Sequence, residues 1–503
     1  MYKTRAGKSR AKNKRSVCFA TANRPLDKRR ARLYLQWSHR ADCHAPRSKV
    51  NMIKNTPALS PKLLAGYTAM VKENNLVEPS LFEEYSVKRG LRNPDGSGVL
   101  VGLTRIGCVH GYTFSENEKI AVPGELIYRG INVKDIVAGC EAEKRMGYEE
   151  TAYLVLFGKL PNRAELAQWQ EVLDAHRRLP AGLKDAILRN PGDDLMNSVT
   201  RAILGAYVHD PTPDDVSVAN VLRQSIALVA QMPVMAAYAY KAKHHRGRKP
   251  LLLPAARKGK STAETFLTLC RDSGKCTPLE ATLLDLCLIL HAEHGGGNNS
   301  AFTARVVTSS HSDTYSSAAA AMLSLKGPRH GGANRSVMTQ MEEIKTKVKR
   351  WNREADVADY IRKILAKKAG DGTGLIYGLG HAVYTISDPR TDMLREKARE
   401  LAAAAGREDE LALYEMVERL GPQLFNENRA KPRKLCVNVD FYSGFVYDML
   451  GISPDLYTPI FAVSRMVSWC AHRMEELVNS GPIVRPAYKA INKNAPFTPL
   501  DQR

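Results

Sequence analysis

The sequence predicts a predominantly α-helical protein. Three observations support this: a helical periodicity over residues 357–365, a capping box that begins an apolar segment at Thr277, and the scarcity of strand patterns. Within 357–365 the apolar residues recur at intervals of three and four, which places them on one helical face. These residues are Val357, Tyr360, Ile361, Ile364 and Leu365, and Gly370 follows as a stop signal.

Further helices are assigned from their ends. The capping box T-P-L-E at residues 277–280, with Pro at the first helical position, begins a helix through Leu290. Thr458-Pro459 begins another that stops near Gly481, and a third covers 411–420, where Gly421-Pro422 is expected to end it. Strand patterns are confined to 98–103 and 119–128.

The composition is that of a globular protein that can bury a sizeable core. The chain has 503 residues, of which 44% are hydrophobic and 25% charged. Its longest uncharged apolar stretch, residues 224–240, contains Gln231 and Pro233 and is shorter than the ~20 residues that cross a bilayer. An integral membrane protein is therefore not expected.

The net charge of +22 is unevenly distributed. Residues 1–51 carry 15 Lys and Arg against 2 Asp and Glu, whereas the remaining chain carries 59 against 50. This basic segment is interpreted as a disordered extension, and the alternatives are a mitochondrial transit peptide or an arm that binds polyanions such as nucleic acid. Because the segment is poor in Ser and has no clear amphipathic stripe, a cytoplasmic protein is expected, with the mitochondrial matrix as the alternative.

Several chemistries can be set aside. The nine cysteines are scattered without a C-x-x-C pair, which favours free thiols in a reducing compartment. His291-Ala-Glu-His294 is not H-E-x-x-H and lacks a third ligand, so no metal site is expected. The chain has no G-x-S-x-G, which excludes the serine hydrolases built on that motif.

Three segments combine glycine with charged residues, two of them with a histidine as well, in a way that core packing does not require. They are G-P-R-H-G-G-A-N at 327–334, G-L-G-H-A-V-Y at 378–384 with D-P-R at 388–390, and N-V-D-F-Y-S-G at 438–444. Glycines on both sides of His330 allow the backbone to approach a ligand and leave the imidazole uncovered. Taken singly, each histidine is more often a structural residue, so the combination is what points to a site.

Together these segments resemble the citrate synthase family. The resemblance extends from about Gly124, where G-E-L-I-Y-R-G-I matches an early motif, to Pro486. It implies an almost all-helical homodimer in which each subunit has a large domain and a smaller helical domain that closes over the active site. The implied organisation is a basic extension at 1–51, a large domain formed by 52–331 and 452–503, and a small domain formed by 332–451.

The resemblance also implies a catalytic trio. Asp440 would remove a proton from the methyl group of acetyl-CoA, and His330 would stabilise the developing enolate by a hydrogen bond to the thioester oxygen. His381 would polarise and protonate the ketone of oxaloacetate, the second substrate. The implied products are citrate and CoA after hydrolysis of citryl-CoA, with no cofactor besides the CoA thioester that serves as substrate.

The resemblance also implies which arginines bind the two carboxylates of oxaloacetate. Arg390, Arg465 and Arg485 match the family's carboxylate-binding arginines, and His294 matches an additional oxaloacetate ligand. In the family the last arginine is contributed by the partner subunit, so Arg485 is expected to act across a dimer interface. The alternative interpretation of Arg485 is a paired surface charge.

For CoA, the resemblance places the adenine along the backbone of 375–380, which includes Leu375, Gly378 and Gly380. Basic residues that the family often has after the second histidine are replaced here by Ala382 and Thr385. Lys367 is therefore assigned to the CoA phosphates, with its basic neighbours Lys363 and Lys368, or Arg329, as alternatives.

The sequence leaves two alternatives to citrate formation open. A 2-methylcitrate synthase would use propionyl-CoA, and one methylene changes binding by only ~1–3 kcal/mol. In a different class, the chain would bind polyanions non-specifically through residues 1–51.

Overall fold

The computed structural model describes residues 60–502 except 117, 246–250, 252 and 493. The chain forms two compact units, Met1–Val87 and Lys88–Arg503. The predicted extension at 1–51 lies outside the described residues. In the first unit, α2 (Pro61–Asn74) and α3 (Pro79–Glu84) contain no buried residue, and the Ser60 side chain caps α2 by accepting a hydrogen bond from the Leu63 N–H.

The second unit contains one small antiparallel sheet, ordered β1 (Gly107–Ser115), β2 (Glu118–Tyr128) and β3 (Ile131–Asn132). Strand β2 confirms the prediction for 119–128, whereas β1 was not predicted. The predicted strand at 98–103 is wrong: only Gly98 pairs, in an isolated bridge. Leu100 and Leu103 are exposed, so this apolar run has no sheet to pack against within the described part of the chain.

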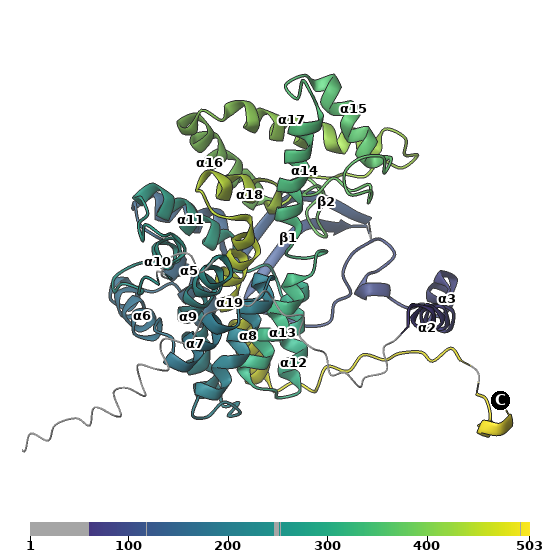
Figure 1. The fold of residues 1–503 in the computed structure, drawn as a ribbon, viewed down its shortest axis with the longest axis horizontal. Coiled ribbons are helices and arrows are strands. Elements are labelled where there is room, and N and C mark those ends of the chain that lie inside the picture. Colours follow the sequence, from purple (N-terminus) through teal and green to yellow (C-terminus); the bar gives the residue numbers. More distant parts are fainter. Residues whose placement is uncertain (1–59, 117, 246–250, 252, 493, 503) are drawn as a thin grey trace, which may run out of the picture. The chain divides into compact units, whose positions relative to one another are not determined.

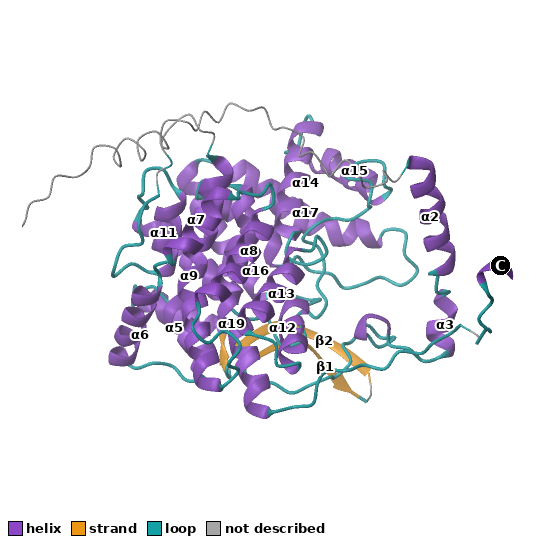
Figure 2. Cartoon of the chain, turned by 60° about the horizontal axis from the view of Figure 1, so that its bottom comes forward, coloured by secondary structure: helices purple, strands orange, loops and turns teal. Residues whose placement is uncertain are grey.

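Helices make up most of the second unit, as the sequence predicted (Figures 1 and 2). The first group is α4 (Val133–Ala142), α5 (Tyr148–Phe157), α6 (Arg163–His176), α7 (Ala181–Arg189), α8 (Leu195–Ala206), α9 (Val218–His244), α10 (Thr262–Cys270), α11 (Pro278–His291), α12 (Asn299–Ser309), α13 (Thr314–Lys326) and α19 (Tyr457–Asn479). The second group is α14 (Ala333–Lys347), α15 (Glu354–Leu365), α16 (Pro389–Ala405), α17 (Glu408–Asn426) and α18 (Val439–Met449). Short 3₁₀ turns are η1 (Arg89–Leu91), η2 (Tyr207–His209), η3 (Pro454–Leu456) and η4 (Leu500–Gln502).

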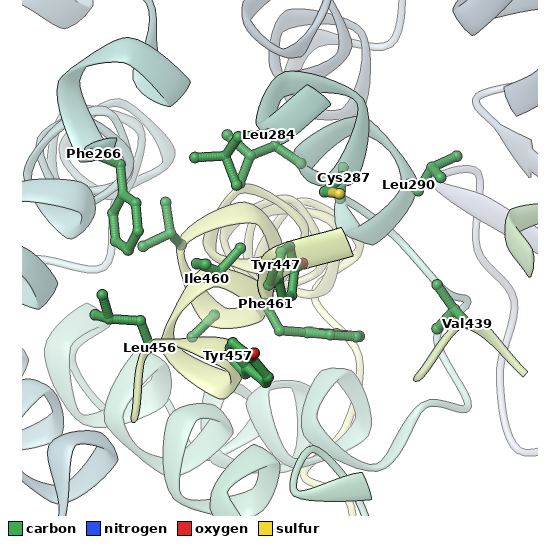
Figure 3. Packing of buried hydrophobic residues seen from close by; sticks show 14 of the residues in the cluster. Phe266, Leu284, Cys287, Leu290, Val439, Tyr447, Leu456, Tyr457, Ile460 and Phe461 are labelled. Carbon is green, nitrogen blue, oxygen red and sulfur yellow. The ribbon is translucent and has the colours of Figure 1, made fainter. Parts of the chain in front are cut away.

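Helix α19 is the central element of the first group. It packs against α5, α9, α11, α12 and α13. Residues 459–473 are buried without interruption, because a helix surrounded on all sides has no face left for solvent. Figure 3 shows Ile460 and Phe461 near its start, with Leu284 and Cys287 of α11 and Tyr447 of α18 around them.

Helices α14 to α18 gather at the top of Figure 1 and pack mainly on one another, through the pairs α14–α18, α16–α18, α15–α17 and α16–α17. The predicted small domain, 332–451, contains all five. Its boundaries, and those of the large domain, stay predictions.

The predicted helix signals are partly confirmed. The capping box of α11 is present, and α15 buries Val357, Ile361 and Ile364 as expected. Gly421-Pro422 does not end α17, which continues to Asn426. A proline removes one backbone hydrogen bond but does not end a helix whose packing continues. Here Gly421 lies buried against Leu379 and Ile376.

Candidate active site

A short backbone pairing joins the second and third motifs. The Gly380 N–H donates to the Cys436 carbonyl at 2.8 Å, and the Asn438 N–H donates to the Gly378 carbonyl at 2.8 Å. Gly378 has φ +75°, and a Cβ there would lie 2.9 Å from side-chain carbons of Phe441 and Val337. This close approach requires glycine, and it brings His381 and the start of α18 together.

Asn438 connects the same two segments with its side chain. Its Oδ1 caps α18 by accepting from the Asp440 N–H at 3.0 Å, and its Nδ2 donates to the Gly380 carbonyl at 2.9 Å. Asp440 is therefore placed in the first turn of α18, beside the segment that carries His381.

The tautomer of His381 is determined by the backbone. Its Nδ1 accepts from the N–H groups of Val383 and Tyr384, both at 3.1 Å, so the ring proton belongs on Nε2. The ring stacks on Tyr384 at a centroid distance of 4.6 Å. Burial, followed by the charge of Arg390, lowers the pKa of His381 to about 4, so the imidazole is neutral at pH 7.

His294 follows α11 and pairs directly with His381. The two Nε2 atoms are 3.0 Å apart. Because His381 Nε2 carries a proton, His294 Nε2 must accept, which places the His294 proton on Nδ1. That Nδ1 is buried without a hydrogen-bond partner, and burial holds the pKa of His294 well below its usual value.

His330 lies in the turn between α13 and α14. Its Nε2 is 3.3 Å from the hydroxyl oxygen of Ser300 at the start of α12. The Trp469 indole N–H donates to the same oxygen at 3.2 Å. Burial, followed by the charge of Arg465, lowers the pKa of His330 to about 4. Neither Ser300 nor Trp469 stands in a motif that suggests contact with His330, so neither could be predicted as a site residue.

Arg465 is fully buried and only partly satisfied. Its Nε donates to the His291 carbonyl at 2.6 Å, but Nη1 and Nη2 have no hydrogen-bond partner. Burial lowers the pKa of this guanidinium to about 10, against the opposing charge of Glu293. Unpaired donors on a buried cation are the arrangement that an anionic ligand would complete.

Arg390 is buried in a bidentate pair with Asp388. The Nε–Oδ1 distance is 3.0 Å and the Nη2–Oδ2 distance is 2.7 Å. Asp388 also caps α16 by accepting from the Arg390 N–H, so the D-P-R motif both starts the helix and orients its own arginine. The D-P-R motif alone did not predict this role of Asp388.

Asp440 is partly buried and electrostatically coupled to both arginines. Burial raises its pKa to about 7, and Asp388 adds to this, whereas Arg390 and Arg465 oppose it. A carboxyl group with a pKa near 7 can take up and release a proton at physiological pH.

The remaining predicted residues lie elsewhere. Arg485 is exposed in the segment after α19. Lys367 lies just before the loop at 370–377 and Leu375 lies within it, and both are exposed. The buried Gln340 of α14 holds that loop. Gln340 donates to the Leu375 carbonyl at 3.0 Å and accepts from the Tyr377 N–H at 3.1 Å.

A cavity of about 570 Å³ opens beside this loop, between α14, η3 and the start of α8. It is lined by Gly332, Arg335, Thr339, Tyr377 and Asp455, among others. Within the described ranges, His, Cys, Asp and Glu side chains form no cluster suited to a metal ion. None of the helices described there is long and apolar enough to cross a membrane.

Comparison with known proteins identifies the family. The chain matches the family model described as citrate synthase, C-terminal domain, over residues 95–487. It is 33% identical to the citrate synthase of Synechocystis over 76% of this chain and 88% of the relative. It is also 33% identical to the 2-methylcitrate synthase of Shewanella oneidensis, over 72% of this chain and 87% of the relative.

A solved structure shows the same fold. A Thermoplasma acidophilum citrate synthase, solved in ternary complex with carboxymethyl coenzyme A and oxaloacetate, aligns with a TM-score of 0.68 at 24% identity, covering 83% of this chain and 99% of that one. The family model and the curated relatives define an enzyme, an acyltransferase that converts the acyl group to an alkyl group on transfer. The chain belongs to the citrate synthase family.

Proposed function

We propose that this enzyme is a citrate synthase that condenses acetyl-CoA with oxaloacetate and hydrolyses citryl-CoA to citrate and CoA. The observation that supports this best is Asp440, a carboxyl group with a pKa near 7 coupled to a buried arginine whose Nη donors are unpaired. A base poised near neutral pH beside an anion-binding group suits proton abstraction followed by attack on a carboxylated ketone.

The first step is enolisation. Asp440 takes a proton from the acetyl methyl group, and the C–H electron pair moves toward the thioester oxygen. Because a carboxylate is a weak base for such a carbon acid, the developing negative charge on that oxygen must be stabilised as it forms. We assign this to His330, which would donate from Nδ1 while Ser300 donates its hydroxyl hydrogen to Nε2.

The second step is carbon–carbon bond formation. The enol carbon attacks the ketone carbon of oxaloacetate, and the ketone oxygen takes up the Nε2 proton of His381. The two backbone N–H groups on His381 Nδ1 suit this role, because they keep the proton on the nitrogen that faces away from the backbone. Water then adds to the citryl thioester, giving one proton back to His381 and one to the departing sulfur. The C–S bond breaks, CoA leaves as the thiol, and Asp440 releases the methyl proton to solvent.

Oxaloacetate would be held by its two carboxylates. Arg465 offers two unpaired Nη groups, and Arg390 is pre-oriented by Asp388. His294 would contact the same substrate. In a homodimer, Arg485 of one subunit would reach the site of the other, which agrees with its exposure in the single chain.

CoA would lie along the loop at 375–380, with Leu375, Gly378 and Gly380 contributing backbone and Lys367 facing the phosphates. The family relationship supports both substrates, because the Thermoplasma relative was solved with a CoA analogue and oxaloacetate.

The alternative acyl donor is propionyl-CoA, which would make the product 2-methylcitrate. It is favoured by the similarity to a 2-methylcitrate synthase at the same 33% identity. Thiol release from acetyl-CoA and from propionyl-CoA, each with and without oxaloacetate, tests both. A higher kcat/KM for acetyl-CoA supports citrate formation, a higher value for propionyl-CoA supports the alternative, and no oxaloacetate-dependent release from either refutes the proposal.

We also propose a cytoplasmic location, on the composition of residues 1–51. A fusion of this segment to a reporter tests it, and mitochondrial import with cleavage would contradict it. Binding to nucleic acid that weakens with salt and disappears on deletion of 1–51 would indicate an additional polyanion-binding role.

A further inference from the structure

A network of hydrogen-bonded polar side chains adjoins His294 of the candidate active site, and none of the proposed steps uses it. Its centre is Glu293, which is fully buried. Glu293 Oε1 accepts from the Gly295 N–H at 2.6 Å and from His472 Nε2 at 3.1 Å. The Ser468 hydroxyl of α19 donates to Oε2. Both carboxylate oxygens are therefore engaged by the protein itself.

Arg305 of α12 determines the direction of this network. Its Nε and Nη2 lie 3.1 Å and 2.7 Å from His472 Nδ1. A guanidinium only donates, so His472 Nδ1 accepts and the ring proton belongs on Nε2, facing Glu293. Arg305 is itself paired with Glu475 and with Glu476, the latter at 3.0 Å. The Arg305 donors on His472 Nδ1 and the His472 Nε2–H thus point in sequence toward Glu293.

Glu293 directly precedes His294, and its carboxylate closes the turn that carries this histidine. The hydrogen bond to the Gly295 N–H spans the His294 backbone, and Gly295 has φ +80°. The stem of Glu293 is also tightly packed, because a Cβ on Gly107 of β1 would lie 2.6 Å from its Cγ. The turn therefore has little freedom while this carboxylate is in place.

We propose that Glu293 is a positioning residue that, held by His472, fixes the His294 turn and so sets the affinity for oxaloacetate without touching it. The inference rests on the proposed contact of His294 with oxaloacetate. The atom responsible is Glu293 Oε1, because it accepts the hydrogen bond from the Gly295 N–H across the turn.

Two substitutions separate the hydrogen bond from the charge. Glu293→Asp keeps the negative charge but withdraws the carboxylate from Gly295 by one methylene. Glu293→Gln removes the charge but keeps an oxygen that can accept from Gly295 and His472, while its amide NH₂ can donate to Ser468. We expect Glu293→Asp to weaken oxaloacetate binding about tenfold, the effect of one lost buried hydrogen bond. We expect the oxaloacetate Kd of Glu293→Gln to stay within about threefold of the parent value, because the hydrogen bond to Gly295 is retained.

The measurements are the Kd of oxaloacetate by calorimetry, the KM of acetyl-CoA, and amide hydrogen exchange over residues 293–298 without ligand. Exchange should accelerate in Glu293→Asp and not in Glu293→Gln, and the KM of acetyl-CoA should stay within about twofold for both. Glu149 provides the matched control. It is also buried and accepts a backbone N–H at 2.6 Å, from Thr262, so Glu149→Asp should leave the oxaloacetate Kd and the 293–298 exchange unchanged.

Loss of affinity in Glu293→Gln equal to that in Glu293→Asp would overturn the proposal, since charge and not position would then govern binding. Unchanged exchange in a folded Glu293→Asp would overturn it as well. If Glu293→Asp does not fold, His472→Ala removes the donor that holds the carboxylate. That variant must show faster amide exchange over residues 293–298 and about threefold weaker oxaloacetate binding. The effect is smaller because the bond from Gly295 to Glu293 is then weakened and not removed. A parent protein that does not bind oxaloacetate would refute the proposed function, whereas the exchange data would still test the positioning of the turn.

Discussion

Replacing Asp440 by Asn is expected to stabilise the free enzyme while removing most of its turnover. The pKa of Asp440 is about 7 in the fold against an ordinary value of 3.8. Between these pH values the folded state binds more protons at this site than the unfolded chain, so stability falls as pH rises from about 4 to 7. Asn is neutral at every pH and avoids that loss.

The expected gain follows from the two pKa values. At 1.36 kcal/mol per pKa unit, the full cost of the ionised carboxylate above pH 7 is about 4 kcal/mol. Asp440 is only partly buried, and solvent screening reduces this to about 2 kcal/mol. Unfolding entropy scales with chain length at ~2.1 cal/mol/K per residue, so for this chain of 503 residues 2 kcal/mol corresponds to a rise in Tm of about 2 °C.

Thermal unfolding of both proteins at pH 8 and pH 5, alongside turnover, provides the assay. The Tm difference should shrink to less than half at pH 5, where Asp440 is already mostly protonated in the fold. The kcat at pH 8 should fall about 10²–10⁴-fold, because the general base is lost. A variant that is no more stable at pH 8, or whose gain is the same at pH 5, would refute the reasoning about the pKa. Retention of more than about a tenth of the turnover would refute the assignment as base.

Three further predictions concern other parts of the chain. Arg485→Ala should raise the KM of oxaloacetate more than about tenfold by leaving a carboxylate unpaired in a desolvated site, and an unchanged KM would place Arg485 outside the pocket. Gly378→Ala should cost about 1–3 kcal/mol of stability in denaturant titrations and raise the KM of acetyl-CoA, since its Cβ would collide with Phe441. Gly372→Ala, with the same φ of +75° and nothing within 4 Å, isolates the backbone contribution, and an equal loss there would argue against the collision. Deletion of residues 1–51 should leave melting temperature and specific activity unchanged, and a drop of several degrees would show that the segment is structural.

The sequence was most informative where a local signal is sufficient. The capping box at Thr277 and the periodicity of α15 depend only on neighbouring residues, and both were confirmed. Strand β1 was missed because His110 and Gly111 interrupt its alternation, and the register shifts at that point. The reason for a glycine at position 111 is visible only in the tertiary fold, because a Cβ there would lie 2.9 Å from the Val383 carbonyl oxygen.

The candidate site could be predicted as a set of residues but not as a hydrogen-bonded arrangement. Motifs named His381 and His294, yet their tautomers depend on backbone N–H groups and on a contact between residues 87 positions apart. The position of Ser300 beside His330 likewise follows from how α12 packs, for which a single sequence carries no signal.

The hydrogen bond between His294 and His381 has a consequence for inhibitor selectivity. Each histidine already satisfies the other at Nε2. Any molecule that enters between them must break this bond, which costs about 0.5–1.5 kcal/mol unless the newcomer replaces it. A dicarboxylate with a carbonyl oxygen between its two acid groups offers His381 a new acceptor and recovers that loss. Succinate, which has only methylenes at that place, leaves the His381 N–H without a partner and should compete poorly despite carrying the same two charges.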